Sequence, residues 1–186
     1  ETRKGLNLGE AAGFIVLESE KSLQLSGKTP VAKLTGWSNA SDAFHQTASS
    51  PDGYGATISM QEALDVARLQ PSDIDYINAH GTATPNNDLS ESHAIKTIFK
   101  DNIPPFSSTK AYTGHTLAAS GGIEAVFAIL ALEQGLLYPN LNFSTPIVET
   151  GLVPQLKFED GKTIKNVLSN SFGFGGNNST VILSAI

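Results

Sequence analysis

The chain is organised around the stretch Asn78-Ala-His-Gly-Thr-Ala-Thr-Pro85. It follows the apolar run 74–77 and precedes a helical pattern, so His80 is expected where a buried strand ends in a loop. In an open α/β sheet, ligands bind beyond the carboxyl ends of the strands. The glycine after His80 permits close backbone approach, and the hydroxyls of Thr82 and Thr84 can donate and accept hydrogen bonds. This stretch therefore predicts a binding site, and the alternative is a plain turn in which His80 caps a neighbour.

Patterns on both sides of this stretch alternate between strand and helix, which predicts a layered α/β fold. Strands are expected at 13–18, 31–37, 75–79, 166–170 and 180–185, with an extended piece at Phe106. Helical segments are expected over 18–26, over 56–69, from Asp88 and over 117–134. The polar segment 39–54 is expected to be a loop, and loops of that length are often functional.

Two of the predicted helices carry distinctive signals. The helix from Asp88 has Glu91 three residues further on, which is the spacing of a capping box. The helix 117–134 is apolar on nearly all sides and is therefore expected to be a central buried helix. Gly121-Gly122 inside it lowers its helix propensity, and the expected reason is close packing against another element.

Composition limits the classes of protein that fit. The chain has 186 residues, 40% hydrophobic and 16% charged, as in a soluble globular domain with a sizeable core. A net charge of −6 without a basic cluster argues against a nucleic-acid partner. The longest apolar run, 125–132, is too short to span a membrane, and no secretory signal is visible, so a cytoplasmic location is expected. The absence of cysteine excludes disulfides, zinc–thiolate sites and a thiol nucleophile within this chain.

Chemistry-bearing residues recur in two further segments, 108–115 with Lys110 and His115, and the glycine-rich turn 172–176. Two neutral imidazoles near strand ends can donate to a developing enolate or oxyanion, and a lysine can orient them. Taken singly, each of these residues could instead be an ordinary surface group. The glycines do not continue as a dinucleotide-binding fingerprint, because Asn178 stands at the last glycine position and no helix pattern follows. Neither HExxH nor GxSxG is present, and His93 is expected to be a solvated surface residue.

Three motifs carry a specific resemblance. NAHGTATPNND (78–88), STKAYTGHTLAASGGIE (108–124) and NSFGFGG (170–176) resemble the C-terminal motifs of β-ketoacyl-acyl carrier protein synthases, and GEAAGFIVLE (9–18) resembles a strand upstream of them. The resemblance implies a thiolase-like α/β fold, represented by its C-terminal half. It divides the chain into residues 1–38, the terminal strands of the N-terminal half, and residues 39–186, the C-terminal domain.

The resemblance also implies roles for particular residues. His80 and His115 match the catalytic histidine pair that holds the thioester carbonyl of malonyl-carrier protein during decarboxylation. Lys110 matches the lysine beside that pair, and Phe174 matches a phenylalanine that gates entry.

Two further sets follow from the resemblance. Four residues match positions that contact or line the phosphopantetheine arm: His45, Thr47, Thr82 and Thr84. Four match positions that bind a structural monovalent cation in some members: Asn78, Glu124, Ser169 and Asn170. Internal hydrogen bonding without a metal is the alternative for this second set. No cofactor is expected to be required, because phosphopantetheine arrives on the carrier protein.

The implied reaction is decarboxylative Claisen condensation of an acyl group with malonyl-carrier protein. The expected partners are acyl carrier protein, malonyl and acyl thioesters, the N-terminal half and further copies of the chain. The family's cysteine nucleophile lies in the N-terminal half, so this chain alone is expected to be inactive. The alternatives are a polyketide or aryl-polyene ketosynthase, a silent chain-length subunit, a non-catalytic scaffold or binding fragment, and a thiolase, which the HGTATP and GFGG patterns disfavour.

Overall fold

A five-stranded sheet forms the centre of the molecule, in the order β1-β5-β4-β2-β3. The computed structural model describes residues 3–186. The strands are β1 Lys33–Ser41, β2 Tyr76–Asn78, β3 Phe106–Ser107, β4 Asn166–Gly173 and β5 Asn177–Ser184. The α-helices are α1 Glu20–Ser26, α2 Tyr54–Ala67, α3 Pro85–Phe99, α4 Lys110–Thr113 and α5 Ser120–Gln134, with 3-10 helices η1 Pro71–Asp73 and η2 Leu117–Ala119. The predicted layered α/β fold is confirmed.

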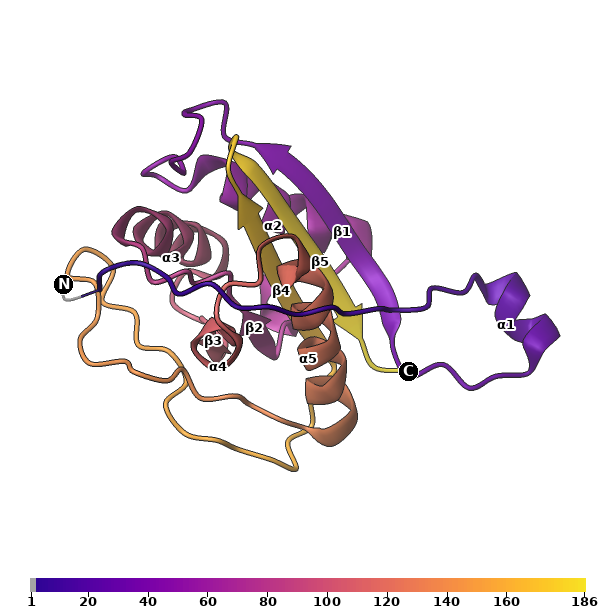
Figure 1. The fold of residues 1–186 in the computed structure, drawn as a ribbon. Coiled ribbons are helices and arrows are strands. Elements are labelled where there is room, and N and C mark those ends of the chain that lie inside the picture. The colour runs from indigo at the N-terminus through magenta and orange to yellow at the C-terminus, as the bar shows by residue number, and fades with distance from the viewer. Residues whose placement is uncertain (1–2) are drawn as a thin grey trace.

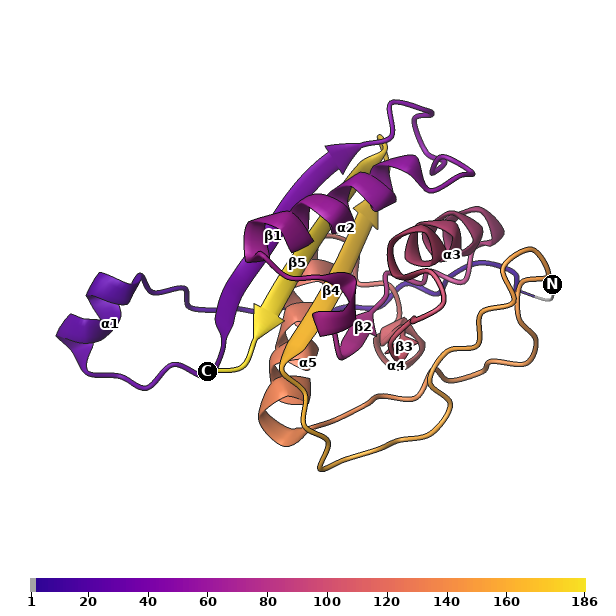
Figure 2. The same ribbon diagram turned by 180° about the vertical axis from the view of Figure 1, so that it is seen from behind.

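Helices lie on both faces of this sheet, with α2 and α3 on one face and α5 on the other (Figures 1 and 2), and the strands buried on both sides are the central ones, β2 and β4. Against α2 and α3, one apolar cluster includes Ile77 of β2 and Leu168 of β4. Against α5, a second cluster includes Tyr76 and Val167, their immediate neighbours in the chain. Adjacent strand residues point to opposite faces, so β2 and β4 contribute to both clusters.

Strand direction gathers several loops at one edge of the sheet. β2 pairs in parallel with both β3 and β4. The carboxyl ends of these three strands therefore point the same way, which is where α/β sheets bind ligands. His80 follows β2, Lys110 follows β3 and Phe174 follows β4.

The helix predicted from Asp88 begins earlier, at Pro85, with Thr84 as its N-cap residue. Proline suits the first helical turn because its missing N–H has no helical partner there and its φ is already near the helical value. The expected capping box with Glu91 is wrong, because the Glu91 carboxylate accepts hydrogen bonds from backbone N–H groups outside the helix.

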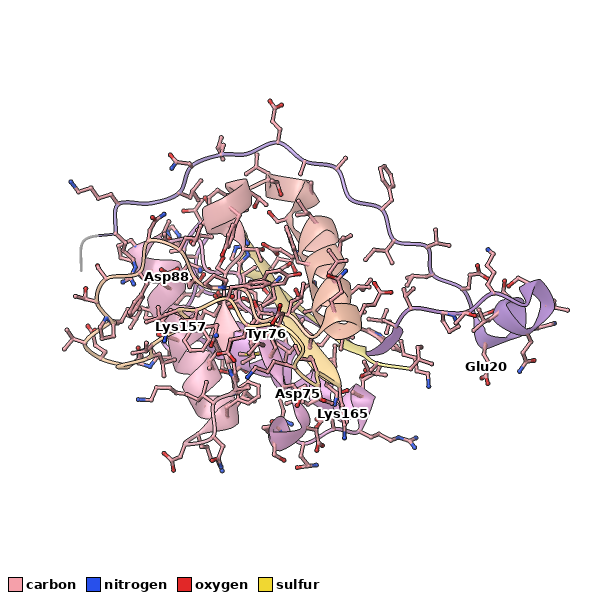
Figure 3. All side chains as sticks on the ribbon, turned by 90° about the horizontal axis from the view of Figure 1, so that it is seen from below. Glu20, Asp75, Tyr76, Asp88, Lys157 and Lys165 are labelled. Carbon is pink, nitrogen blue, oxygen red and sulfur yellow. The ribbon has the colours of Figure 1, made fainter. Side chains whose placement is uncertain are left out.

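The N-terminal segment differs most from expectation. The strand predicted at 13–18 is wrong, since these residues pair with no strand among residues 3–186, and the Phe14 side chain is 91% exposed. A strand needs a neighbour for its backbone hydrogen bonds, and none lies beside this segment. Figure 3 shows the segment arching outside α5 toward α1, where Glu20 is labelled.

The predicted division at residue 38 falls inside β1. β1 pairs with β5 along its whole length, from Lys33 to Ser41. The strand expected at 31–37 thus belongs to the same sheet as the C-terminal strands, and only the segment before it stands apart from that sheet.

The helix 117–134, expected to be a central buried helix, is buried along one side and half-buried elsewhere. One stripe, including Ala125, Ala128 and Ala131, is buried against the sheet. Five apolar side chains are only half-buried: Ile123, Val126, Phe127, Ile129 and Leu130. The predicted close packing of the glycine pair is confirmed, since a Cβ on Gly122 would lie 3.3 Å from the Gly13 carbonyl oxygen.

Within residues 3–186, the segment 117–134 is long and apolar enough to cross a membrane by length and composition. This corrects the expectation that no such segment exists. The segment contains Glu124, which forms a buried ion pair with Lys110, and it packs against the second apolar cluster. It is therefore the core helix of this fold.

We expect the chain to self-associate in solution. Phe14, Val16 and Leu17 are largely exposed beside the half-buried side of α5, and contiguous exposed apolar surface favours association. Light scattering of the chain over a range of concentrations should show a mass that rises with concentration. The double variant Phe14→Lys, Leu17→Lys should associate less. A constant monomer mass for the unmodified chain would contradict this expectation.

Candidate active site

Two histidines and a lysine meet at the carboxyl edge of the sheet. The ring centroids of His80 and His115 lie 5.4 Å apart, with the rings at 85° to one another. The Lys110 Nζ lies 3.1 Å from the His80 Nδ1. The predicted convergence of these three side chains is confirmed. They come from the end of β2 and from the start and end of α4.

His80 is the more deeply buried of the two histidines, with 3% of its surface exposed. Burial lowers its pKa well below the usual range, and the charges of Lys110 and then His115 lower it further. The imidazole is therefore neutral at pH 7. A lysine ammonium can only donate, so it donates to Nδ1, and the His80 proton resides on Nε2.

His115 is half-buried, and different contacts give its ring the same protonation state as His80. Its Nδ1 lies 3.1 Å from the backbone nitrogen of Leu117, whose N–H can only donate. Burial lowers the pKa of His115, followed by the charge of Lys110. The proton of this neutral ring therefore also lies on Nε2. Two neutral N–H donors side by side can hold one developing oxyanion.

Lys110 is not the surface amine that its residue type alone would suggest. Only 8% of its surface is exposed, and its Nζ forms a buried ion pair with Glu124 on α5. Glu124 also accepts a hydrogen bond from the Ser171 hydroxyl at 3.4 Å. The carboxylate thereby holds the ammonium against the His80 ring and links α5 to the site.

The free energy of unfolding is expected to fall between about pH 5 and pH 7. Burial raises the pKa of Glu124 from an ordinary 4.5 to about 7, although Lys110 opposes the shift. Over that interval the folded chain binds more protons than the unfolded chain, so stability decreases as pH rises, by on the order of 1–3 kcal/mol for such a shift. Urea unfolding at several pH values should show this slope. Glu124→Gln should flatten it, and an unchanged slope in that variant would contradict the assignment.

Sequence reasoning missed the role of Glu91, which lies fully inside the protein. Its carboxylate accepts N–H groups from His80 at 2.9 Å and Gly81 at 2.8 Å, and the Asn170 amide at 3.1 Å. Burial raises its pKa, against the lowering effect of these donors. Glu91 thus holds the backbone of the His80 loop. The sequence contained a signal of this burial, because Glu91 stands at helical spacing before Ala94 and Ile95, on the apolar side of α3.

Gly81 permits close packing between two segments of the site. Its φ is +46°, and a Cβ there would lie 2.5 Å from the Ser108 Cβ. The Ser108 hydroxyl is positioned for hydrogen bonds to the carbonyl oxygens of His80, at 3.2 Å, and Gly81, at 3.1 Å. The loop after β2 and the segment after β3 are therefore locked together beneath the histidine pair.

The four predicted substrate-binding residues lie in two places. Thr82 and Thr84 follow the His80 loop, and their hydroxyl oxygens are 2.8 Å apart. His45 and Thr47 are exposed in the loop after β1, where the His45 Nδ1 accepts the Thr47 N–H at 3.1 Å. Their contact with a pantetheine arm stays a prediction.

The loop carrying His45 is tied to the turn that carries Phe174. The Gly175 N–H donates to the Gln46 carbonyl at 2.7 Å, and the Asp42 N–H donates to the Gly176 carbonyl at 2.8 Å. Asp42, which is buried, also accepts the Gly55 N–H at the start of α2. The two loops and this helix thus form one connected unit.

Phe174→Ala is expected to affect function more than stability. The side chain is 80% exposed, which contradicts its interpretation as a core phenylalanine. We expect an unfolding free-energy loss of less than about 1 kcal/mol, compared with about 3–5 kcal/mol for a core phenylalanine. Urea unfolding of the chain and acyl-selectivity assays of the complete protein test this. A large stability loss with unaltered kinetics would contradict a gating role.

In the predicted cation set, the side chain of one member lies apart from the other three. Asn78 and Ser169 share the face toward α5, where the Asn78 amide donates to the Ser169 hydroxyl oxygen at 3.3 Å. Asn170 points to the opposite face, because neighbouring strand residues alternate, and its amide bonds to Glu91. Its side chain therefore cannot join the other three.

One observation favours a cation at the remaining residues. The buried Asn78 Oδ1 has no hydrogen-bond partner. Asn78, Ser169 and Glu124 offer the oxygen ligands that hard cations prefer. Among residues 3–186, no group of three or more His, Asp or Glu side chains could hold a metal ion, so a site here would combine the single carboxylate of Glu124 with the neutral oxygens of Asn78 and Ser169. A monovalent cation at these three residues stays a prediction.

A cavity of about 440 Å³ opens beside the histidine pair. Its lining includes Thr82, Lys110 and His115, with the N-terminal segment 3–7 and residues 140–145 on its other walls. His80 lies behind this lining, so of the two imidazoles only His115 borders the cavity. A ligand in the cavity could therefore reach His115 and Lys110 directly.

Comparison with known proteins agrees with this architecture. A family model described as the beta-ketoacyl synthase C-terminal domain matches residues 31–144. The chain is 41% identical over 184 residues to a 3-oxoacyl-[acyl-carrier-protein] synthase 2 of Staphylococcus aureus, covering 98% of this chain and 46% of that protein. The chain therefore spans about half the length of the curated relatives that it matches.

Solved ketosynthases have the same fold. The ishigamide ketosynthase/chain length factor aligns over 100% of this chain and 45% of its own, with a TM-score of 0.92 and 34% identity. A type II polyketide ketosynthase in complex with its acyl-carrier protein covers 91% of this chain and 42% of its own, with a TM-score of 0.84 and 33% identity.

The fold and the arrangement of the site are those of one half of a thiolase-like protein. The chain belongs to the β-ketoacyl synthase family and carries its C-terminal domain.

Proposed function

We propose that this chain is the C-terminal part of a β-ketoacyl-acyl carrier protein synthase that condenses an acyl group with malonyl-carrier protein in fatty acid synthesis. The observation that carries the proposal is the buried cluster of His80, His115 and Lys110, in which both imidazoles are neutral donors. Such a cluster suits a reaction that places negative charge on a carbonyl oxygen.

In the proposed reaction, the carbonyl oxygen of the malonyl thioester accepts hydrogen bonds from the Nε2–H groups of His80 and His115. The bond between the α-carbon and the carboxylate breaks, carbon dioxide leaves, and the electron pair forms an enolate held by both donors. The enolate carbon then attacks an acyl thioester on a cysteine of the N-terminal half. The cysteine leaves as a thiolate, and the β-ketoacyl product remains on the carrier protein.

Binding of the carrier protein is part of the same proposal. Its phosphopantetheine arm would run past Thr82 and Thr84, beneath the loop that carries His45 and Thr47, so that no separate cofactor is needed. The relatives support this arrangement, since one solved ketosynthase is a complex with its acyl-carrier protein and another is a ketosynthase/chain length factor. We propose association with the N-terminal half and with further copies.

A polyketide ketosynthase is the second candidate. It is favoured by the match to the ishigamide ketosynthase/chain length factor over the whole chain. Both candidates use the same decarboxylation step, and they differ in the acyl chains accepted and in the number of extensions. Product lengths formed by the complete protein with a series of acyl-carrier proteins distinguish them.

The proposal is tested by incubating malonyl- and acyl-carrier protein with the isolated chain and, separately, with the complete protein that contains it. The complete protein should release carbon dioxide, form an acyl adduct and make the β-ketoacyl product. The isolated chain has no cysteine and should show no adduct and little or no decarboxylation, because covalent catalysis needs an activated nucleophile. A folded complete protein that never decarboxylates malonyl-carrier protein would favour a scaffold, and a stoichiometric adduct on the isolated chain would overturn the mechanism.

A further inference from the structure

We propose that Ser120 is a positioning residue that holds His115 as the neutral ring with its proton on Nε2. This inference rests on the proposed function for its consequence, but the ring state itself can be measured without any activity.

The Ser120 hydroxyl lies beside the His115 ring. Ser120 opens α5, only 4% of its surface is exposed, and its Oγ lies 3.1 Å from the His115 Nδ1. The Leu117 N–H, at 3.1 Å, already requires an unprotonated Nδ1. Because that nitrogen is unprotonated, the Ser120 hydroxyl can bond to it only as a donor.

The Ser120 hydroxyl also has a second partner, Thr116. The Thr116 Oγ1 lies 3.2 Å from the Ser120 Oγ. Once Ser120 donates to the ring, its oxygen can accept the proton of Thr116, so the three groups form a directed chain from Thr116 through Ser120 to His115. The hydrogen-bond contacts of the Ser120 hydroxyl are the ring and Thr116.

The backbone conformation at Leu117 points to the same ring nitrogen. Leu117 has a φ of +53°, in the left-handed region that a leucine adopts only at an energetic cost. Its side chain is 60% exposed, so packing of that side chain does not explain the conformation. The conformation accompanies the N–H bond to His115. A strained backbone and a buried hydroxyl thus converge on a single ring nitrogen.

The two contacts at Nδ1 determine the state of the other ring nitrogen of His115, Nε2. Two donors at Nδ1 favour the neutral ring over the imidazolium, in which Nδ1 would carry a proton. They also oppose rotation of the ring and exchange of its tautomer. The Nε2–H then stays aimed at the position of the thioester oxygen, as the proposed reaction requires.

The test uses nitrogen-15 NMR of histidine-labelled protein as a function of pH, comparing the unmodified sequence with Ser120→Ala and Ser120→Thr. Ser59→Ala is the matched control, because Ser59 is also a buried helix serine whose hydroxyl contacts a threonine hydroxyl, at 3.0 Å from Thr180. In the unmodified protein, the His115 Nδ1 should be unprotonated. Ser120→Ala should raise the titration midpoint of His115 toward its ordinary value and increase the Nδ1–H tautomer. Ser120→Thr should restore the unmodified behaviour, and Ser59→Ala should not change it.

Decarboxylation by the complete protein is the second readout. Ser120→Ala should lower the rate about 2- to 10-fold, as expected for the loss of one neutral hydrogen bond, with the low-pH limb of the profile moved upward. A protonated Nδ1 in the unmodified protein, or a His115 titration unaffected by Ser120→Ala, would overturn the proposal. If the NMR changes occur but the complete protein lacks decarboxylase activity, the positioning role stands and the proposed function fails.

Discussion

His80→Ala in the complete protein is expected to lower malonyl-carrier-protein decarboxylation about 100- to 1,000-fold. Removal of one preorganised oxyanion donor has an effect of this size. His80 has the more constrained of the two rings, with 3% exposure, a Lys110 contact at Nδ1 and the Phe172 ring 5.6 Å away. Neither His45 nor His93 could replace it, because both lie outside the cluster.

The measurement is carbon dioxide release from malonyl-carrier protein under saturating conditions, with urea unfolding of each variant to confirm the fold. His93→Ala is the matched control, since His93 is a half-buried histidine of α3 that has no part in the site, and it should retain its activity. A His80→Ala variant that is folded and within about threefold of the unmodified rate would contradict the proposed role.

Glu91→Ala is expected to lower the free energy of unfolding by roughly 2–4 kcal/mol, the largest stability effect we expect from a polar residue here. The change removes the acceptor for the N–H groups of His80 and Gly81 and for the Asn170 amide. Each buried donor left without a partner costs about 1–3 kcal/mol, less where water enters the space. The His80 loop should also lose its fixed position, so decarboxylation should fall together with stability.

Urea unfolding checks this value, and Glu133→Ala is the control because Glu133 is an exposed glutamate on α5. That control should change stability by less than about 0.5 kcal/mol. Glu91→Gln keeps one acceptor oxygen and should lose less stability than Glu91→Ala. Equal stability of Glu91→Ala and the unmodified chain would mean that the loop does not depend on this carboxylate.

Local sequence patterns were sufficient to predict those structural features whose physical cause is local. Helical spacing of apolar residues predicted α2, α3 and α5 because a helix buries one stripe, and Gly27 marked the end of α1 through its left-handed conformation. The alternation of strand faces is itself enough to separate Asn170 from Ser169, because the two are neighbours in one predicted strand. The motif resemblance correctly named the three residues that meet in the site.

Burial and pairing could not be predicted in the same way. The run at 13–18 has the composition of a strand, but a strand exists only beside a partner, and residues 3–186 supply none. The helix 117–134 is apolar on most sides, but how much of it is buried depends on what covers it, and only one stripe meets the sheet.

The sequence by itself determined the α/β class, the helices, and which side chains could carry the chemistry, because periodicity and residue type act along the chain. Only the tertiary structure decided that Lys110 sits between His80 and Glu124, that Glu91 holds the His80 loop, and that both imidazoles are neutral. The reason is physical. A pKa and a hydrogen-bond partner depend on desolvation and on charges a few ångströms away, and here those neighbours come from β2, α3, α4 and α5, which are separated in the sequence and meet only at the edge of the sheet.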